Sequence, residues 1–230
     1  MGIPLKPDSF DLQKACYDVL KANKLAEARL RLTVSAGEGD MTPNPDTCSD
    51  ITVFIAARRL VPLPPESYQA GFVAVLSSLR RNSQSPLSRL KSTCYLENVL
   101  ARQAARAAGA DEALILNERG FVAEGSTTNI FLAKGRLLVT PSVESGALPG
   151  ITRQVVLGLA RSVGLEAVEE EVELDELVEA EEAFLTNSII GIIPLTRFGD
   201  KPIGPGRPGA LTQQLMSAYQ ELVDKETHPH

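Results

Sequence analysis

Two residues in the middle of the chain have side chains that together suit carbonyl chemistry. Lys91 precedes a segment with apolar residues at helical spacing, and Glu124 ends a short apolar segment typical of a strand. An enclosed lysine amine loses its charge readily and then attacks carbonyl carbons. A nearby carboxylate can hold a heteroaromatic ring nitrogen in its protonated form. Spacing alone favours the alternative, a surface lysine and a glutamate in a turn, because such residues are common in soluble domains.

Periodicity predicts the elements around this pair. A helix is predicted over residues 93–108, and Gly109 ends it. Two strands are predicted over 113–116 and 121–123, joined by a turn at 117–120. A further strand over 129–132 follows the break at 124–126. In this arrangement the strand that ends at Glu124 can run beside Lys91.

The same stretch, with two motifs after it, resembles the fold-type IV pyridoxal phosphate enzymes. The matching runs, in the family's order, are K-S-T-x-Y-x-x-N-V-L-A, E-A-L-I-L-N-x-x-G-F-V-A-E-G-S-T-T-N-I-F, T-P and A-L-P-G-I-T-R. That family includes branched-chain aminotransferases, D-amino acid aminotransferases and aminodeoxychorismate lyase. The resemblance implies an α/β (α+β) fold of two domains, like D-amino acid aminotransferase, and pyridoxal 5'-phosphate as the cofactor.

The resemblance also implies roles for single residues. It makes Lys91 the Schiff-base lysine and the catalytic residue, and Glu124 the partner of the pyridine nitrogen. Tyr95 matches a tyrosine that lies near the cofactor's phenolic oxygen in some members. The other cofactor-binding residues that it implies are Asn129, Gly150, Ile151, Thr152 and Ser188.

A phosphate group is expected at the helix that opens after residues 148–150. Gly150 lets the backbone approach a ligand closely, and free N–H groups at a helix N-terminus suit an anion. Without the resemblance, an ordinary helix start would be preferred. The hydroxyls of Thr186 and Ser188, at a strand end, either bind phosphate or cap a turn. By resemblance, Ser188 is the residue expected at the phosphate.

Two residues are candidates for binding substrate. Arg31 lies near the place where some relatives have an arginine for the substrate carboxylate. However, Arg29 and Arg31 alternate along a predicted strand, and the alternative is that they form its solvent face. Asn187 lies in the segment that the family places on the substrate side.

The run F-L-T-N-S-I-I-G-I-I-P-L resembles aminodeoxychorismate lyase most. That enzyme releases pyruvate and 4-aminobenzoate, a folate precursor. A branched-chain or D-amino acid aminotransferase stays the alternative, because the cofactor residues serve both reactions. A catalytically impaired member that binds cofactor weakly is the second alternative.

A small α/β domain is predicted over residues 1–83 and a large cofactor-binding domain over 84–230, with the polar segment 80–88 as their connection. The small domain is expected to hold a helix, capped by Asp8 or Ser9 and running to about residue 23, and strands over 28–36, 51–57 and 71–77. It is also expected to be incomplete, because family members carry a further N-terminal segment that supplies an arginine for the phosphate.

Composition excludes several other functions. The net charge of −6 argues against a nucleic-acid partner, and no apolar run approaches the length of a membrane helix. The two histidines, His228 and His230, lie in the terminal tail, so a histidine base or a histidine-ligated zinc is not expected. Three widely spaced cysteines form no metal pattern and indicate a reducing cytoplasm. By resemblance, a homodimer is expected, with the active site near the subunit contact.

Overall fold

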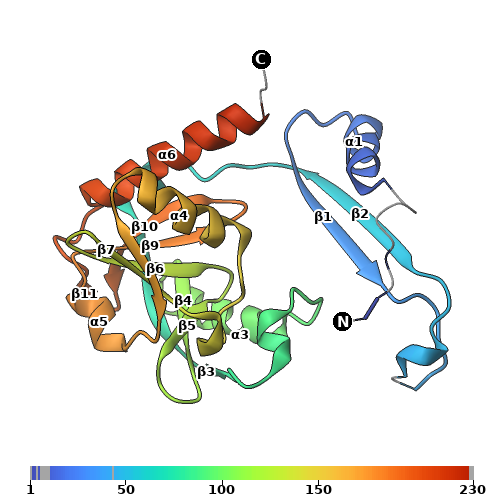
Figure 1. Cartoon of the computed structure of the whole chain (residues 1–230), viewed down its shortest axis with the longest axis horizontal. Coiled ribbons are helices and arrows are strands. Elements are labelled where there is room, and N and C mark those ends of the chain that lie inside the picture. The colour runs from blue at the N-terminus through green and yellow to red at the C-terminus, as the bar shows by residue number, and fades with distance from the viewer. Residues whose placement is uncertain (1, 4, 6–10, 43, 228–230) are drawn as a thin grey trace. The chain divides into compact units, whose positions relative to one another are not determined.

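The chain folds as two compact units, residues 1–62 and 63–230 (Figure 1). The computed structural model describes residues 2, 3, 5, 11–42 and 44–227. The predicted helix caps Asp8 and Ser9, and the tail histidines, lie outside the described residues. No helix in the described part of the chain is both long enough and apolar enough to cross a membrane.

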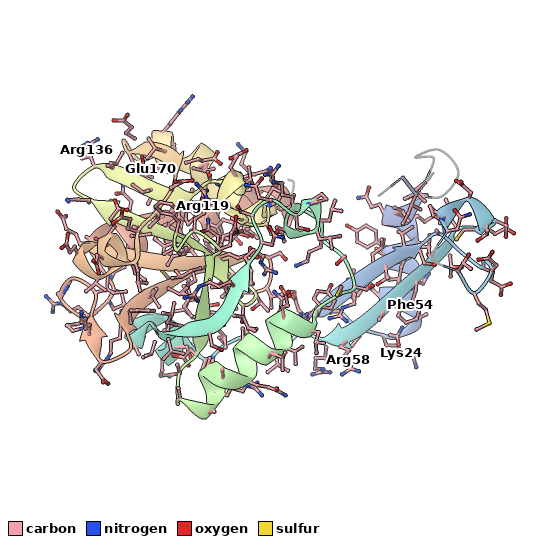
Figure 2. The ribbon with its side chains drawn as sticks, turned by 90° about the horizontal axis from the view of Figure 1, so that it is seen from below. Lys24, Phe54, Arg58, Arg119, Arg136 and Glu170 are labelled. Carbon is pink, nitrogen blue, oxygen red and sulfur yellow. The ribbon has the colours of Figure 1, made fainter. Side chains whose placement is uncertain are left out.

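The first unit is a two-stranded ribbon with one α-helix. Helix α1 (Leu12–Ala22) begins after Asp11, whose side chain accepts the Lys14 N–H at 2.8 Å. Strand β1 (Ala28–Ser35) pairs antiparallel with β2 (Thr52–Arg59), and a 3-10 turn, η2 (Pro45–Thr47), lies between them. None of this unit's described residues is buried. Phe54 on β2, labelled in Figure 2, is 60% exposed.

The second unit is built on one large curled sheet. Its strand order is β5-β4-β3-β10-β9-β6-β7-β8, and β11 pairs with β10. Val122 on β5 also bridges to Val172, just beyond β8, so the two ends of the sheet approach each other. The strands are β3 (Phe72–Arg81), β4 (Glu112–Asn117), β5 (Val122–Gly125), β6 (Asn129–Lys134), β7 (Leu137–Pro141), β8 (Glu166–Glu170), β9 (Glu182–Asn187), β10 (Gly191–Phe198) and β11 (Lys201–Pro202).

Helices cover this sheet. They are α2 (Pro65–Ala70), α3 (Leu96–Ala107), α4 (Ile151–Ser162), α5 (Leu174–Glu179) and α6 (Ala210–Thr227), with 3-10 turns η3 (Pro86–Arg89) and η4 (Val143–Ser145). Helices α4 and α6 lie together over one face of the sheet (Figure 1). Helix α3 packs Ala101 and Ala105 against Ile115 of β4. Because it spans 96–107, the helix is shorter than the predicted 93–108.

Alternating side chains explain why the central strands are buried on both faces. On β6, Ile130 and Leu132 face the core inside the curl, whereas Phe131 faces the core under α4 and α6. Phe131 stacks on Phe184 of β9 with ring centroids 4.9 Å apart. Such two-sided burial makes β6 and β9 a rigid platform for the residues at their ends.

The division between the units corrects the predicted boundary after residue 83. The prediction places the strand over 71–77 in the small domain, yet β3 pairs in parallel with both β4 and β10 of the large sheet. The predicted connection at 80–88 also contains the last two residues of β3, Arg80 and Arg81, and the turn η3. These polar residues resemble a linker in sequence because their partners are distant along the chain.

Candidate active site

Lys91 and Glu124 line one small cavity of about 70 Å³. Lys91 lies in the loop between η3 and α3, and its side chain is exposed. Glu124 lies on β5 and is 7% exposed. Tyr95, which immediately precedes α3, lines the same cavity. The structure therefore brings together the amine, the carboxylate and the phenol that the sequence singles out.

The Glu124 carboxylate is held at both oxygens. Oε1 accepts a hydrogen bond from Nη2 of Arg81 at 2.8 Å, and Oε2 accepts one from the Leu148 N–H at 2.9 Å. Burial raises the pKa of Glu124, and the charges of Arg81 and Lys91 together with these hydrogen bonds act to lower it. Because a carboxylate has about four acceptor positions, Glu124 can still accept a hydrogen bond from a further donor.

The turn that follows Glu124 is fixed by a second buried acid. Glu112, which is 1% exposed, accepts hydrogen bonds from the Ser126 N–H and the Thr128 hydroxyl, both at 3.0 Å, and from the Ser126 hydroxyl. A side chain on Gly125 would lie 2.1 Å from the Thr128 hydroxyl oxygen, so only glycine fits there. Asn98 of α3 donates to the Ser126 carbonyl at 2.6 Å. The G-S-T-T run is therefore a clamped turn that holds the end of β5.

Asn129, at the start of β6, braces the turn that leads into α4. Its Nδ2 donates to the Leu148 carbonyl at 2.9 Å. A Cβ on Gly150 would lie 2.2 Å from its Oδ1, so the backbone of Gly150 passes very close to this amide. Leu148 thus connects Glu124, through its N–H, with Asn129, through its carbonyl.

The N-terminus of α4 lies next to this turn. Gly150 is its N-cap residue and provides no side-chain cap, and the first N–H groups of a helix have no partner within the helix. Thr152 is 4% exposed, whereas Ile151 is largely exposed. Such a helix start can bind an anion through its backbone. The phosphate-binding roles of Gly150, Ile151 and Thr152 stay predictions.

The two hydroxyls at the end of β9 lie in different settings. Thr186 lies directly opposite Asn129 in the β6–β9 pair, and its buried hydroxyl has no hydrogen-bond partner in the described part of the chain. Ser188 is exposed in the turn after β9. The prediction named both hydroxyls and preferred Ser188 as the phosphate ligand. Phosphate binding by Ser188 stays a prediction.

The two predicted substrate residues occupy different settings. Asn187 uses its side chain to shape the turn, because Nδ2 donates to the Thr127 carbonyl at 3.2 Å and Oδ1 accepts from the Ile189 and Ile190 N–H groups at 2.9 and 3.0 Å. Arg31 lies exposed on β1, opposite Ala56, in the first unit. Substrate binding by either residue stays a prediction.

Sequence reasoning missed two residues that line the cavity, Arg81 and Asn98. Arg81 ends β3 and forms ion pairs with Glu124, 43 residues further along the chain, and with Glu97 of α3. In the sequence Arg81 lies in the polar segment 80–88 that is predicted to connect the domains, so no signal marked it as a site residue. Asn98 stands inside the K-S-T-x-Y-x-x-N motif, where its contact with the Ser126 carbonyl gives it a structural role.

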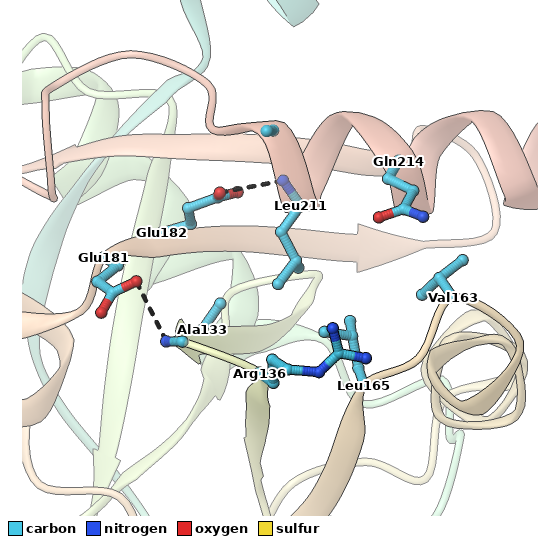
Figure 3. A pocket seen from close by; sticks show the side chains of 10 residues that line it. Ala133, Arg136, Val163, Leu165, Glu181, Glu182, Leu211 and Gln214 are labelled. Atoms are coloured by element: carbon cyan, nitrogen blue, oxygen red, sulfur yellow. Dashed lines mark hydrogen bonds between the residues drawn. The ribbon is translucent and has the colours of Figure 1, made fainter.

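A larger cavity of about 320 Å³ lies elsewhere in the second unit and contains none of the predicted site residues (Figure 3). Its two glutamates already have partners. Glu182 accepts the Leu211 N–H at the start of α6 (Figure 3). It also accepts the Thr212 N–H, and Glu181 accepts the Gly135 N–H at 3.1 Å. Its lining includes neither a free nucleophile nor an amine beside a carboxylate, so size alone does not make it the candidate active site.

Comparisons with known proteins decide the family. The pattern of the family described as amino-transferase class IV matches residues 1–198. The chain belongs to this family. It is 37% identical over 226 residues to a putative branched-chain-amino-acid aminotransferase of Methanocaldococcus jannaschii, covering 98% of this chain and 77% of that protein. It is 36% identical over 215 residues to the aminodeoxychorismate lyase of Bacillus subtilis, covering 91% of this chain and 71% of that protein.

Solved structures agree with this class IV assignment. The branched-chain amino acid aminotransferase of T.th. with pyridoxamine 5'-phosphate has a TM-score of 0.88 and 30% identity, covering 99% of this chain and 74% of that chain. The predicted α/β fold of the fold-type IV enzymes is thereby confirmed. The chain is an enzyme of this family, and its cofactor is pyridoxal 5'-phosphate.

The residues present fit such a cofactor. Lys91 would supply an amine for its aldehyde, and Glu124, which lines the same cavity, would supply an acceptor for its ring nitrogen. The N-terminus of α4 would offer backbone donors for its phosphate. Leu148 joins these two places through hydrogen bonds at both of its backbone groups.

Proposed function

We propose that this class IV enzyme is an aminodeoxychorismate lyase that releases pyruvate and 4-aminobenzoate. The observation that carries its chemistry is the single cavity lined by both Lys91 and Glu124. Two findings support the choice of lyase: the F-L-T-N-S-I-I-G-I-I-P-L run, and the 36% identity to the Bacillus subtilis lyase.

Lys91 and Glu124 have separate roles in this proposal. Lys91 binds the cofactor aldehyde through its side-chain nitrogen. Once the substrate amine has displaced it, the Lys91 amine removes the proton from the carbon that bears that amine. Glu124 accepts a hydrogen bond from the ring nitrogen and so keeps that nitrogen protonated. The bound cofactor supplies an electron sink for the electrons that the lost proton leaves behind.

Phosphate binding is assigned to backbone and hydroxyl donors. In this proposal the α4 N-terminus, with Gly150, Ile151 and Thr152, binds the phosphate together with Ser188. Tyr95 lies at the phenolic oxygen, Asn129 braces the turn, and Arg31 and Asn187 face the substrate. A homodimer in the cytoplasm completes the proposal.

A branched-chain aminotransferase is the second candidate, because the 37% identical relative is described as one. Both reactions begin with removal of the same proton, so the cofactor residues do not separate them. A lyase expels pyruvate after that step, whereas an aminotransferase returns the proton to the cofactor and releases a keto acid.

Two measurements test the proposal. First, the protein is incubated with pyridoxal phosphate, reduced with borohydride and digested; mass spectrometry should find the cofactor on Lys91, and Lys91→Ala should lose both the label and turnover. Lys134→Ala, at the exposed end of β6, is the matched control and should keep both. Second, aminodeoxychorismate is compared with branched-chain and D-amino acids supplied with 2-oxoglutarate.

Each outcome decides between the candidates. Release of pyruvate from aminodeoxychorismate, without transamination, supports the lyase. Turnover of the amino acids alone overturns it in favour of an aminotransferase. If the protein is folded but borohydride attaches no cofactor to Lys91, the chain is an impaired member of the family.

A further inference from the structure

Arg81 binds two carboxylates that come from different elements around the cavity. Its Nη2 lies 2.8 Å from Oε1 of Glu124 on β5, and its Nη1 lies 3.1 Å from Oε2 of Glu97 in the first turn of α3. The arginine side chain is 12% exposed, Glu124 is 9% exposed and Glu97 is 63% exposed at their side chains. One guanidinium thus has one buried and one solvated partner.

The Arg81 side chain has little freedom to move. Gly146, whose φ is +92°, packs against it so closely that a Cβ there would lie 2.9 Å from the Arg81 Cγ. The backbone of Arg81 is also fixed, because its carbonyl accepts the Glu118 N–H at 3.2 Å. Because the guanidinium is planar and its stem is held, its direction toward Glu124 is set by the fold.

The charge of Arg81 is as constant as its position. An arginine does not lose its proton at any pH at which proteins are folded. A buried carboxylate, by contrast, is strongly driven to take up a proton unless a cation or hydrogen-bond donors stabilise its charged form. Lys91 also acts on Glu124, but an amine that forms a bond to a carbonyl ligand is not a constant charge.

We propose that Arg81 is a positioning residue that holds the Glu124 carboxylate ionised and aimed at the cavity throughout the reaction. This inference rests on the proposed function, in which Glu124 must accept a hydrogen bond from a protonated ring nitrogen. If Glu124 were neutral, the proton would lie on the carboxyl and the ring nitrogen would lose it. Arg81 itself does not need to touch the substrate.

A purely structural tie is the competing explanation, since Arg81 also joins β3 to α3 through Glu97. Glu97→Gln is therefore the matched control. It removes an ion pair of the same guanidinium, but at the solvated end, where such pairs contribute little. If Arg81 only ties elements together, its substitution should not change the protonation of a ring nitrogen bound beside Glu124.

The first experiment uses the whole protein without cofactor. Urea unfolding is measured for Arg81→Gln, Glu124→Gln and the double variant, and for the corresponding cycle with Glu97→Gln. We expect Arg81→Gln to raise the unfolding equilibrium constant at least tenfold, and much less when Glu124→Gln is also present. The cycle with Glu97→Gln should show less than a threefold coupling. Additive effects of Arg81→Gln and Glu124→Gln would overturn the inference, whatever the cofactor does.

The second experiment measures the protonation state of the cofactor's ring nitrogen directly. Protein loaded with ¹⁵N-labelled pyridoxal phosphate is examined by NMR as the pH is raised, with borohydride labelling of Lys91 confirming attachment. We expect the ring nitrogen to be protonated at neutral pH in the unsubstituted protein and in Glu97→Gln, largely neutral in Arg81→Gln, and partly restored in Arg81→Lys. A protonated ring in Arg81→Gln would overturn the inference while the proposed function stands. If the unsubstituted protein takes up no cofactor, the proposed function fails, and the unfolding cycle alone decides whether Arg81 positions Glu124.

Discussion

The two units of this chain differ in what holds them together. The unit formed by residues 63–230 buries three clusters of apolar residues, whereas no described residue of the unit formed by residues 1–62 is buried. A two-stranded ribbon with one helix rarely has enough core to be stable alone. Tyr17, Leu32 and Phe54 of the small unit are all exposed. The residues predicted to bind the cofactor thus lie in the unit that has its own core.

The largest expected effect compares one phenylalanine from each unit. Phe184→Ala removes a fully buried ring that stacks on Phe131, and we expect it to lower the free energy of unfolding by about 3–5 kcal/mol. Phe54→Ala removes a ring that is 60% exposed, and we expect a change within about 0.5 kcal/mol. Urea unfolding followed by circular dichroism measures both. A cost for Phe54→Ala as large as that for Phe184→Ala would show that the small unit buries Phe54 in solution.

An intermediate effect compares two acids that accept hydrogen bonds from hydroxyls. Glu112→Ala leaves the Ser126 N–H and the hydroxyls of Ser126 and Thr128 without their acceptor inside the large unit. We expect the free energy of unfolding to fall by about 2–3 kcal/mol. Asp40 in the small unit accepts from the backbone and hydroxyl of Thr42 at the surface.

Asp40→Ala should therefore cost clearly less than Glu112→Ala, because water replaces the lost acceptor. Glu112→Gln, which keeps one acceptor oxygen, should recover part of the loss. Thermal unfolding of the three variants under one set of conditions measures the order. Equal costs for Glu112→Ala and Asp40→Ala would mean that water reaches the Gly125–Thr128 turn.

The smallest expected effect is a difference in pH dependence. Burial raises the pKa of Glu124 above its ordinary value of 4.5, so the folded protein binds this proton more tightly than the unfolded chain. The stability contributed by Glu124 is therefore greatest below pH 4.5 and falls as the pH rises through the folded pKa. Hydrogen bonds from Thr42 lower the pKa of Asp40 below 3.8, so its contribution is present above that pH and is lost on acidification.

Glu124→Gln and Asp40→Asn should consequently change the pH profile of stability in opposite directions. Relative to the unsubstituted protein, the stability of the Glu124→Gln variant should increase as the pH rises from 4.5. The relative stability of the Asp40→Asn variant should decrease as the pH rises from below 3.8. Thermal melts from acid to neutral pH test both signs. A profile for Glu124→Gln parallel to that of the unsubstituted protein would mean that Glu124 titrates at its ordinary pKa.

Much of the fold was predictable because local patterns agreed with the final structure. The strands around Lys91 and Glu124, and the start of helix α4, lie close to their predicted positions, since apolar alternation and helix-start signals are local. The motifs also identified the two residues that share the cavity. The place of β3 was not predictable in this way, because its parallel partners β4 and β10 are reached only through long crossovers.

The parts of the site that sequence reasoning missed depend on contacts between distant residues. Arg81 meets Glu124 only because β3 lies beside β4 and β4 beside β5. Thr186 was named only as an alternative to Ser188, and its setting opposite Asn129 follows from strand register rather than from spacing. Conversely, the hydrogen bonds of Asn187 show that a residue inside a matching motif can use its side chain to stabilise the local turn.

The tripeptide Leu148–Pro149–Gly150 sets the distance between Glu124 and the N-terminus of α4. At one end the Leu148 N–H donates to Glu124, and at the other end Gly150 is the N-cap residue of α4. Asn129 of β6 donates to the Leu148 carbonyl and packs closely against Gly150, so both ends of the tripeptide are held. We expect a ligand that spans from the Glu124 carboxylate to the N-terminus of α4 to match this distance, because hydrogen bonds hold both backbone groups of Leu148.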